Sequence, residues 1–176
     1  MAKSELAWIC GIVPKATNQR IVALCKELNV SVGLPKTVFR FPLHISLKKS
    51  FQTVDFEKVR EDLSVLVKAH GPLECVTGKL VVHRNMIWLP VQKTVSVNAF
   101  HNAIDQLLLE KYGIPLDRFD RDFNPHVSLF TSGKPEQIQE MFSLLREEPE
   151  GLESLRMTIN RFVIGASGHR DVFYEV

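Results

Sequence analysis

The sequence predicts an α+β fold of two pseudo-symmetric lobes, each a small, largely antiparallel sheet with helices outside, facing across a central cleft. One observation is a seven-residue pattern that occurs in both halves of the 176-residue chain. A second is that the strands and helices expected around each copy follow a similar order. A third is the lack of a low-complexity segment, a charge run or a long linker. Residues 1–176 are therefore expected to form a single domain of two lobes.

The first half is expected to begin with a strand and a helix. The apolar run at residues 6–13 predicts the strand, and apolar residues at three- and four-residue spacing predict a helix at 19–28. Residues 29–40 contain glycine and proline and are predicted to be irregular. Such a loop either borders a binding cleft or is a solvated connection.

The first copy of the pattern lies on the next predicted strand, which runs to about residue 49. A helix is expected from Asp55 to His70, because Gly71 and Pro72 then stop it. Residues 73–82 and 86–91 are predicted to form a hairpin. Trp88 in its second strand is expected in the core, since a tryptophan there is more often a core residue than a platform for a ligand.

The second half repeats this order. Residues 95–111 give the clearest helical spacing, and His101 lies off the apolar face, where it is expected at the surface. Residues 114–124 are predicted to be irregular and lead into the second copy. A helix from residue 135 to about 148 follows, and strands at 155–164 and 172–176 are expected on either side of a turn at Gly168.

The repeated pattern reads Phe, two residues, His, a β-branched aliphatic residue, Ser and Leu, at positions 41–47 and 123–129. Both copies contain a proline before the histidine and a β-branched residue after it, which favours extended backbone. None of the other four histidines is followed by serine two residues later. A single copy would be an ordinary half-exposed strand; two copies in register favour a functional site.

Alternate side chains of a strand point to the same face. His44 and Ser46 are therefore expected on one face of the first motif strand, and His126 and Ser128 on one face of the second. The aliphatic residues between and after them are expected to be buried.

Two imidazoles and two hydroxyls suit in-line displacement at phosphorus. His44 and His126 are the predicted catalytic residues, one taking a proton from the attacking oxygen and the other donating one to the leaving oxygen. Ser46 and Ser128 are predicted to bind the phosphate oxygens. The pseudo-symmetry leaves open which histidine is the acid and which the base.

The tetrapeptides His44-Ile45-Ser46-Leu47 and His126-Val127-Ser128-Leu129 resemble the signature of the 2H phosphoesterase superfamily, which carries two His-x-Thr/Ser tetrapeptides on strands. This superfamily includes RNA 2',3'-cyclic phosphodiesterases (the 2'-5' RNA ligase family), enzymes that degrade 2'-5' oligoadenylate, and an exonuclease that trims an RNA tail. The resemblance implies the same residue roles and no metal ion or other cofactor. Two departures are notable: both hydroxyl residues are serine, where many cyclic phosphodiesterases have threonine, and Phe130-Thr131-Ser132 replaces the basic residue that often follows the second motif.

The function expected from the motifs is that of a metal-independent phosphodiesterase acting on an RNA end or a small nucleotide, hydrolysing a 2',3'-cyclic phosphate. The alternatives are a phosphodiesterase for 2'-5' oligoadenylate or an RNA 3' tail, and a non-catalytic module that binds a nucleotide or RNA. No metal site is expected, because neither motif has a carboxylate or a third imidazole at ligand spacing.

Two further residues lie in phase with the motif residues. Lys48 continues the face of His44 and Ser46, so it either adds positive charge at the edge of the cleft or is an ordinary solvated lysine. Phe130 continues the face of His126 and Ser128, so it either stacks on a base of the substrate or turns into the core.

The bulk composition limits the partners. A net charge of +2 is too small to coat duplex DNA, so an RNA end, an oligonucleotide or a cyclic nucleotide is the expected ligand. The run at 6–13 is too short to span a membrane. The protein is expected to be a monomer. Cys10, Cys25 and Cys75 are expected to be buried free thiols in a reducing compartment, the cytoplasm.

Overall fold

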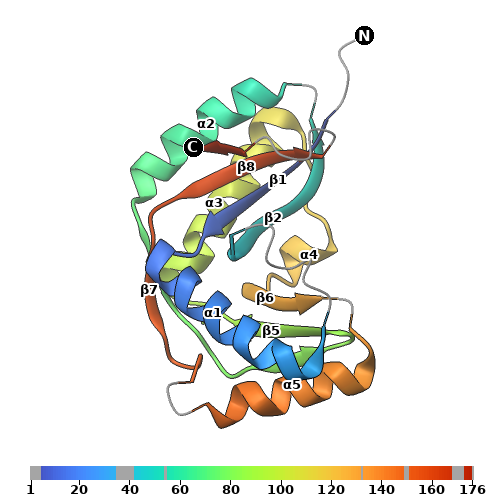
Figure 1. Cartoon of the computed structure of the whole chain (residues 1–176). Coiled ribbons are helices and arrows are strands. Elements are labelled where there is room, and N and C mark those ends of the chain that lie inside the picture. The colour runs from blue at the N-terminus through green and yellow to red at the C-terminus, as the bar shows by residue number, and fades with distance from the viewer. Residues whose placement is uncertain are drawn as a thin grey trace.

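The computed structural model describes residues 5–34, 42–53, 55–131, 133–148, 151–167 and 173–175. It confirms the predicted mixed fold with an antiparallel sheet and outer helices (Figure 1). Seven strands form one sheet in the order β4-β5-β6-β2-β1-β8-β9, and β3 and β7 form a second sheet. The strands are β1 (Glu5–Ile12), β2 (His44–Thr53), β3 (Leu73–Val76), β4 (Val81–His83), β5 (Met86–Pro90), β6 (His126–Thr131), β7 (Arg156–Ile159), β8 (Phe162–Ser167) and β9 (Phe173–Glu175). The helices are α1 (Lys15–Val32), α2 (Phe56–His70), α3 (Val95–Tyr112), α4 (Arg118–Arg121) and α5 (Pro135–Glu147).

The two strands that carry the repeated motif are neighbours at the centre of the large sheet. They pair antiparallel at one position, Ile45 opposite Val127, and this contact is called the central seam below. The strands β1, β8 and β9 continue the sheet beyond β2, and β5 and β4 continue it beyond β6. The seam therefore joins two half-sheets and brings the two motifs together.

The connecting helices cross between the half-sheets. Helix α1 links β1 to β2, yet it packs on α5, which itself packs on β4 and β5 of the other half. Helix α3 links β5 to β6, yet it packs on α2 and β2 (Figure 1). Each half is therefore completed by a helix whose flanking strands belong to the other half.

The main helices begin and end where local chemistry favours it. The Asp55 side chain accepts a hydrogen bond from the Lys58 backbone N–H (3.3 Å) at the start of α2, as the sequence predicted. The Thr94 hydroxyl accepts one from the Val97 N–H (3.2 Å) at the start of α3. Gly113, with φ 64°, ends α3 in the left-handed conformation that glycine adopts without strain.

Helix α1 is longer than predicted, because it continues through Asn29 to Val32 and ends at Gly33, which has φ 71°. Asn29 was expected to open a loop. It is instead buried, and its amide donates to the Leu34 carbonyl (2.9 Å) while its Oδ1 accepts from the Leu34 N–H (2.7 Å). The side chain thereby satisfies the backbone just beyond the helix. Half of the predicted loop, residues 35–40, lies outside the described residues.

The strand predicted at residues 73–82 is two strands in two different sheets, which corrects the predicted hairpin. β3 pairs with β7, and only β4 pairs with β5. The break lies at Thr77, whose buried hydroxyl donates to the Leu152 carbonyl (2.6 Å) and accepts from the Leu155 N–H (2.9 Å). The strand predicted at 155–164 is divided in the same way into β7 and β8. β8 pairs with β9, and their predicted turn at Gly168 lies outside the described residues.

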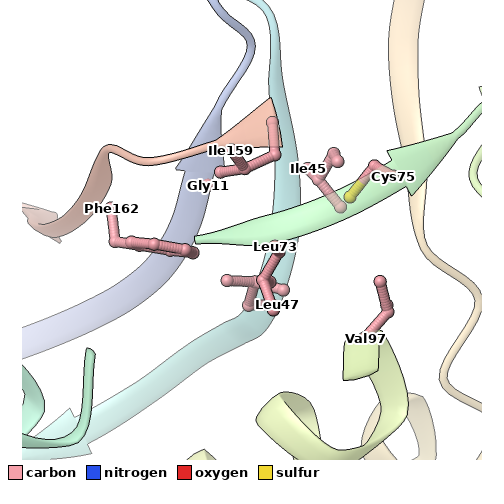
Figure 2. Close-up of a pocket in the computed structure, with 8 residues that line it drawn as sticks. All are labelled: Gly11, Ile45, Leu47, Leu73, Cys75, Val97, Ile159 and Phe162. Atoms are coloured by element: carbon pink, nitrogen blue, oxygen red, sulfur yellow. The ribbon is translucent and has the colours of Figure 1, made fainter. Parts of the chain in front are cut away.

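The core lies between the sheet and the helices. Behind the first motif strand a void of about 10 Å³ has an apolar lining that includes Ile45 and Leu47 (Figure 2). This volume is about the smallest that can hold one water molecule, so the region is packed core.

The three cysteines are free and buried, as predicted, and burial raises the pKa of Cys10 and Cys25 to about 12. No helix within the described ranges is long and apolar enough to cross a membrane.

Candidate active site

The predicted faces of both motif strands are confirmed by the pattern of burial. His44 and Ser46 on β2 are half-buried, with Ile45 and Leu47 fully buried. The second motif strand repeats this pattern residue for residue. An antiparallel register through the central seam sets His44 beside Ser128 and Ser46 beside His126. Each imidazole thus lies across from the hydroxyl of the other motif.

The two histidine rings are held in the same way. His44 Nδ1 donates to the carbonyl of Pro42 (3.1 Å), and His126 Nδ1 donates to the carbonyl of Asn124 (2.8 Å). In both cases the acceptor lies two residues earlier in the chain. A carbonyl accepts but cannot donate, so Nδ1 carries the proton of the neutral ring and Nε2 carries the lone pair. This tautomer suits exchange of a proton through Nε2.

The surroundings lower the pKa of both histidines. Burial is the main cause for each, and the hydrogen bond to a carbonyl raises the pKa in part. For His126 the pKa is lowered further by the positive charges of Lys49, His83 and His44. The second histidine therefore differs from the first, although their sequence motifs match.

Stacked rings hold His126 in place. The Trp88 ring stacks on His126 with a centroid separation of 3.8 Å, and His83 stacks on the other side of Trp88 at 4.0 Å. The Trp88 indole Nε1 is buried and has no hydrogen-bond partner among the described residues. Trp88 was expected to be a core residue, and the structure places it against the His126 ring. Only its place on the strand next to β6 reveals this, because the sequence carries no signal for it.

A cavity of about 420 Å³ lies beside the first motif. Its lining includes Pro42, whose carbonyl holds the His44 ring, and Ile12, which is the partner of His44 on β1. Lys15 and Arg161 also line it and give it a basic edge. This size and position suit a small anionic ligand such as a nucleotide.

The structure corrects the predicted position of Lys48. β2 pairs with β1 through Ser46 opposite Cys10 and Lys48 opposite Ile9, so Leu47 is an extra residue in a β-bulge. The bulge ends the alternation, and Lys48 is only 4% exposed. It is therefore neither at the edge of a cleft nor a solvated lysine.

Phe130 is displaced in the same way. β6 pairs with β5 through Ser128 opposite Trp88 and Phe130 opposite Ile87, so Leu129 is the extra residue. Phe130 is 1% exposed and belongs to the core. Of the two predicted positions the core is the observed one, and stacking on a substrate base is excluded by burial. A bulge thus follows the serine in both motifs.

Lys48 holds a buried network of charges. Its Nζ donates to Asp105 on α3 (2.8 Å) and to Asp120 on α4 (2.5 Å). His101, which was expected at the surface, is 3% exposed and donates from Nδ1 to the carbonyl of Leu47 in the bulge (2.8 Å). Its ring stacks on Phe123 of the second motif, with 3.7 Å between centroids. The network therefore connects the first motif strand to the segment that leads into the second.

The ligand atoms of His101, Asp105 and Asp120 lie within 4.8 Å of one another, a spacing that could hold a metal ion. The ammonium group of Lys48 lies among these groups and bonds to both carboxylates. A cation is thus already supplied by the chain. An added metal ion would have to displace it.

The comparisons with known proteins agree with this architecture. The sequence profile described as the 2'-5' RNA ligase superfamily matches residues 15–169. A search of curated proteins gives no match. The predicted resemblance to 2H phosphoesterases is confirmed.

Solved structures of low sequence identity share the fold. Escherichia coli LigT in its apo form has a TM-score of 0.59 at 12% identity, with 99% of this chain and 95% of that chain covered. LigT complexed with 3'-AMP has a TM-score of 0.61 at 14% identity, with 99% and 95% covered. Kluyveromyces marxianus Usb1 has a TM-score of 0.50 at 14% identity, with 99% and 97% covered.

Proposed function

Since the chain belongs to the 2'-5' RNA ligase superfamily, we propose that it is a metal-independent phosphodiesterase that hydrolyses a 2',3'-cyclic phosphate on an RNA end or a small nucleotide. The members of this family are phosphoesterases, which supports an enzyme that acts on RNA or nucleotides. One observation supports the specific two-histidine mechanism. Two identical His-x-Ser faces pair across the central seam, and each histidine is held through Nδ1.

In the proposed reaction one neutral imidazole takes a proton from water at Nε2 as the water oxygen attacks phosphorus. The bond from phosphorus to one ribose oxygen breaks, and the other imidazole, protonated, donates its Nε2 proton to that oxygen. The product is a phosphomonoester with a free ribose hydroxyl. Ser46 and Ser128 donate hydrogen bonds to the non-bridging oxygens as negative charge increases there.

The basic cavity beside Pro42 supports the choice of substrate. Its volume of about 420 Å³ has room for a nucleotide, and it adjoins His44 through Pro42 and Ile12. The complex of LigT with 3'-AMP is a further reason to propose a nucleotide ligand here. We place the nucleoside of the substrate in this cavity and its phosphate at the seam.

The test is turnover of 2',3'-cyclic nucleotides, 2'-5' oligoadenylate and RNAs with a 3'-terminal uridine tail. His44→Ala and His126→Ala should each lower kcat by roughly 10²–10⁴-fold, the usual contribution of a general acid or base. The double variant should be hardly worse than either single one, because the two groups act as a unit. Ser46→Ala and Ser128→Ala should each cost about tenfold, the value of one hydrogen bond to a charged oxygen.

His70→Ala is the matched control, because His70 is an exposed histidine at the end of α2 and should leave turnover unchanged. Chelators should also leave the wild type unchanged. Loss of activity with a chelator, or near-normal rates in either motif-histidine variant, would overturn the mechanism. Tight binding of these ligands without turnover would instead identify a non-catalytic binding module.

A further inference from the structure

The β-bulge after Ser46 has a second effect, on the lysine that follows Lys48. Lys48 turns inward to Asp120, and Lys49 is exposed on the outside of β2. The Lys49 ammonium lies over the ring of Phe119, 3.2 Å from its centroid. Two consecutive lysines of β2 thus contact two consecutive residues of α4. The first contact is buried and the second is at the surface.

This arrangement fixes where the Lys49 charge can lie. The buried bond from Lys48 to Asp120 holds α4 against β2. Asp117 caps α4 by accepting hydrogen bonds from the backbone N–H groups of Phe119 (2.7 Å) and Asp120 (3.0 Å), which fixes the backbone that carries the Phe119 ring. Phe119 is 50% exposed, so it offers an aromatic face to the ammonium group at the surface.

The position of Lys49 along β2 brings it toward the second motif. β2 and β6 run antiparallel, so residues after Ile45 on β2 lie beside residues before Val127 on β6. Helix α4 and its Phe119 ring immediately precede the lead-in to His126. The charge of Lys49 also lowers the pKa of His126, as expected for a cation near that ring. The residue directly after the second motif is not a cation but the buried Phe130.

We propose that Lys49 is a substrate-binding residue, which reaches from the first motif strand across the central seam to bind the scissile phosphate beside His126. The proposal rests on the proposed function and names the cation of that site. The ammonium group neutralises the phosphate charge as a point charge and needs no fixed fork geometry. The contact with Phe119 restricts the Lys49 side chain. Burial lowers the pKa of Lys49, and the negative charge of Asp117 offsets part of that shift.

Binding of inorganic phosphate, followed by NMR of the histidine ring protons, tests this without requiring turnover. Lys49→Met keeps the apolar contact with Phe119 and removes the charge. It should weaken phosphate binding roughly tenfold or more, as expected for loss of a charge-assisted contact. It should also raise the pKa of His126 and leave that of His44 nearly unchanged, while Lys49→Arg should restore most of both effects. The other charged groups near these two side chains are the same in every variant. They are His83 and His44 near His126, and Asp117 near Lys49.

Lys68→Met is the matched control, because Lys68 is an exposed lysine on α2, and this variant should bind phosphate as the wild type does. Unchanged phosphate affinity in Lys49→Met would overturn the proposal, even if the pKa of His126 moved.

Failure of the proposed function would look different: the wild type would bind phosphate through Lys49 but turn over none of the substrates. Where turnover is measurable, Lys49→Met should raise KM by a similar factor for a cyclic mononucleotide and for an RNA. An effect confined to the RNA would place Lys49 at a neighbouring phosphate and also overturn the proposal.

Discussion

At the scale of single residues, the two motif histidines share one tautomer but differ in their surroundings. Both donate from Nδ1 to a carbonyl two residues earlier. Only His126 also has its pKa lowered by the charges of Lys49 and of His83, which is stacked beyond Trp88. The equivalence implied by the repeated sequence is therefore broken by neighbours that come from β2 and β4.

The pH dependence of kcat/KM should reflect these shifts. A base works above its pKa and an acid below its pKa, so lowering both pKa values moves both limbs of the bell to lower pH. We expect the maximum below pH 6.5, the ordinary histidine value, in assays with a 2',3'-cyclic nucleotide. An optimum clearly above this value would contradict the lowered pKa values.

Replacing His83 tests the origin of the asymmetry. His83→Gln removes one positive charge near His126, so the pKa of His126 should rise and one limb of the bell should move to higher pH. The limb that belongs to His44 should stay in place. His70→Gln, on the distant α2 helix, is the control and should shift neither limb. Equal movement of both limbs would show that His83 does not act on His126 alone.

At the scale of elements, the same irregularity follows both motifs. A strand with strict alternation would place Lys48 and Phe130 on the face of the histidines. The extra residues Leu47 and Leu129 turn the following side chains into the interior. Bulges are frequent next to active sites, where they change the direction of side chains. Here they end each polar face directly after its serine.

Phe130 should accordingly act on stability and not on base preference. Phe130→Ala removes a fully buried ring and should lower the free energy of unfolding by about 3–5 kcal/mol in urea denaturation. Phe130→Leu should be milder and should keep the wild-type preference between adenine and uracil substrates. Leu109→Ala, at a 46% exposed position on α3, should change stability little. An altered base preference in Phe130→Leu would contradict the core assignment.

At the scale of the whole molecule, two connections keep the halves in register. Among the described residues, the two half-sheets pair at the seam only through Ile45 and Val127. The buried network of Lys48, Asp105 and Asp120 ties β2 to α3 and to α4, which precedes the second motif. Helices α1 and α3 cross between the halves in addition. The relative position of the two histidines thus depends on long-range contacts as well as on their strands.

Breaking the network should destabilise the whole fold. Lys48→Met leaves two buried carboxylates without their cation, and loss of one partner of a buried ion pair costs about 3–5 kcal/mol. Lys49→Met changes the adjacent, exposed lysine in the same way and should cost under about 1 kcal/mol. Urea denaturation measures both. Lys48→Met with near wild-type stability would show that the buried charges are not coupled in this way.

The sequence alone determined much of the fold and the identity of the motif residues. Periodicity and capping residues located α2 and α3 closely, because Asp55, Gly71 and Gly113 act through their immediate neighbours in the chain. Alternation identified the faces of His44 and His126 for the same reason. The roles proposed for these histidines and for Ser46 and Ser128 remain predictions for the variants above to test.

Only the tertiary structure decided the positions of residues just beyond each motif. Whether Lys48 or Lys49 is buried depends on which residues of β1 pair with β2, and a bulge changes that pairing without a sequence signal. The stack of His83 and Trp88 on His126 depends likewise on the order of strands in the sheet. Local preferences act over a few residues, whereas these contacts join segments that are distant in sequence. Their geometry is fixed only when the two halves pack together.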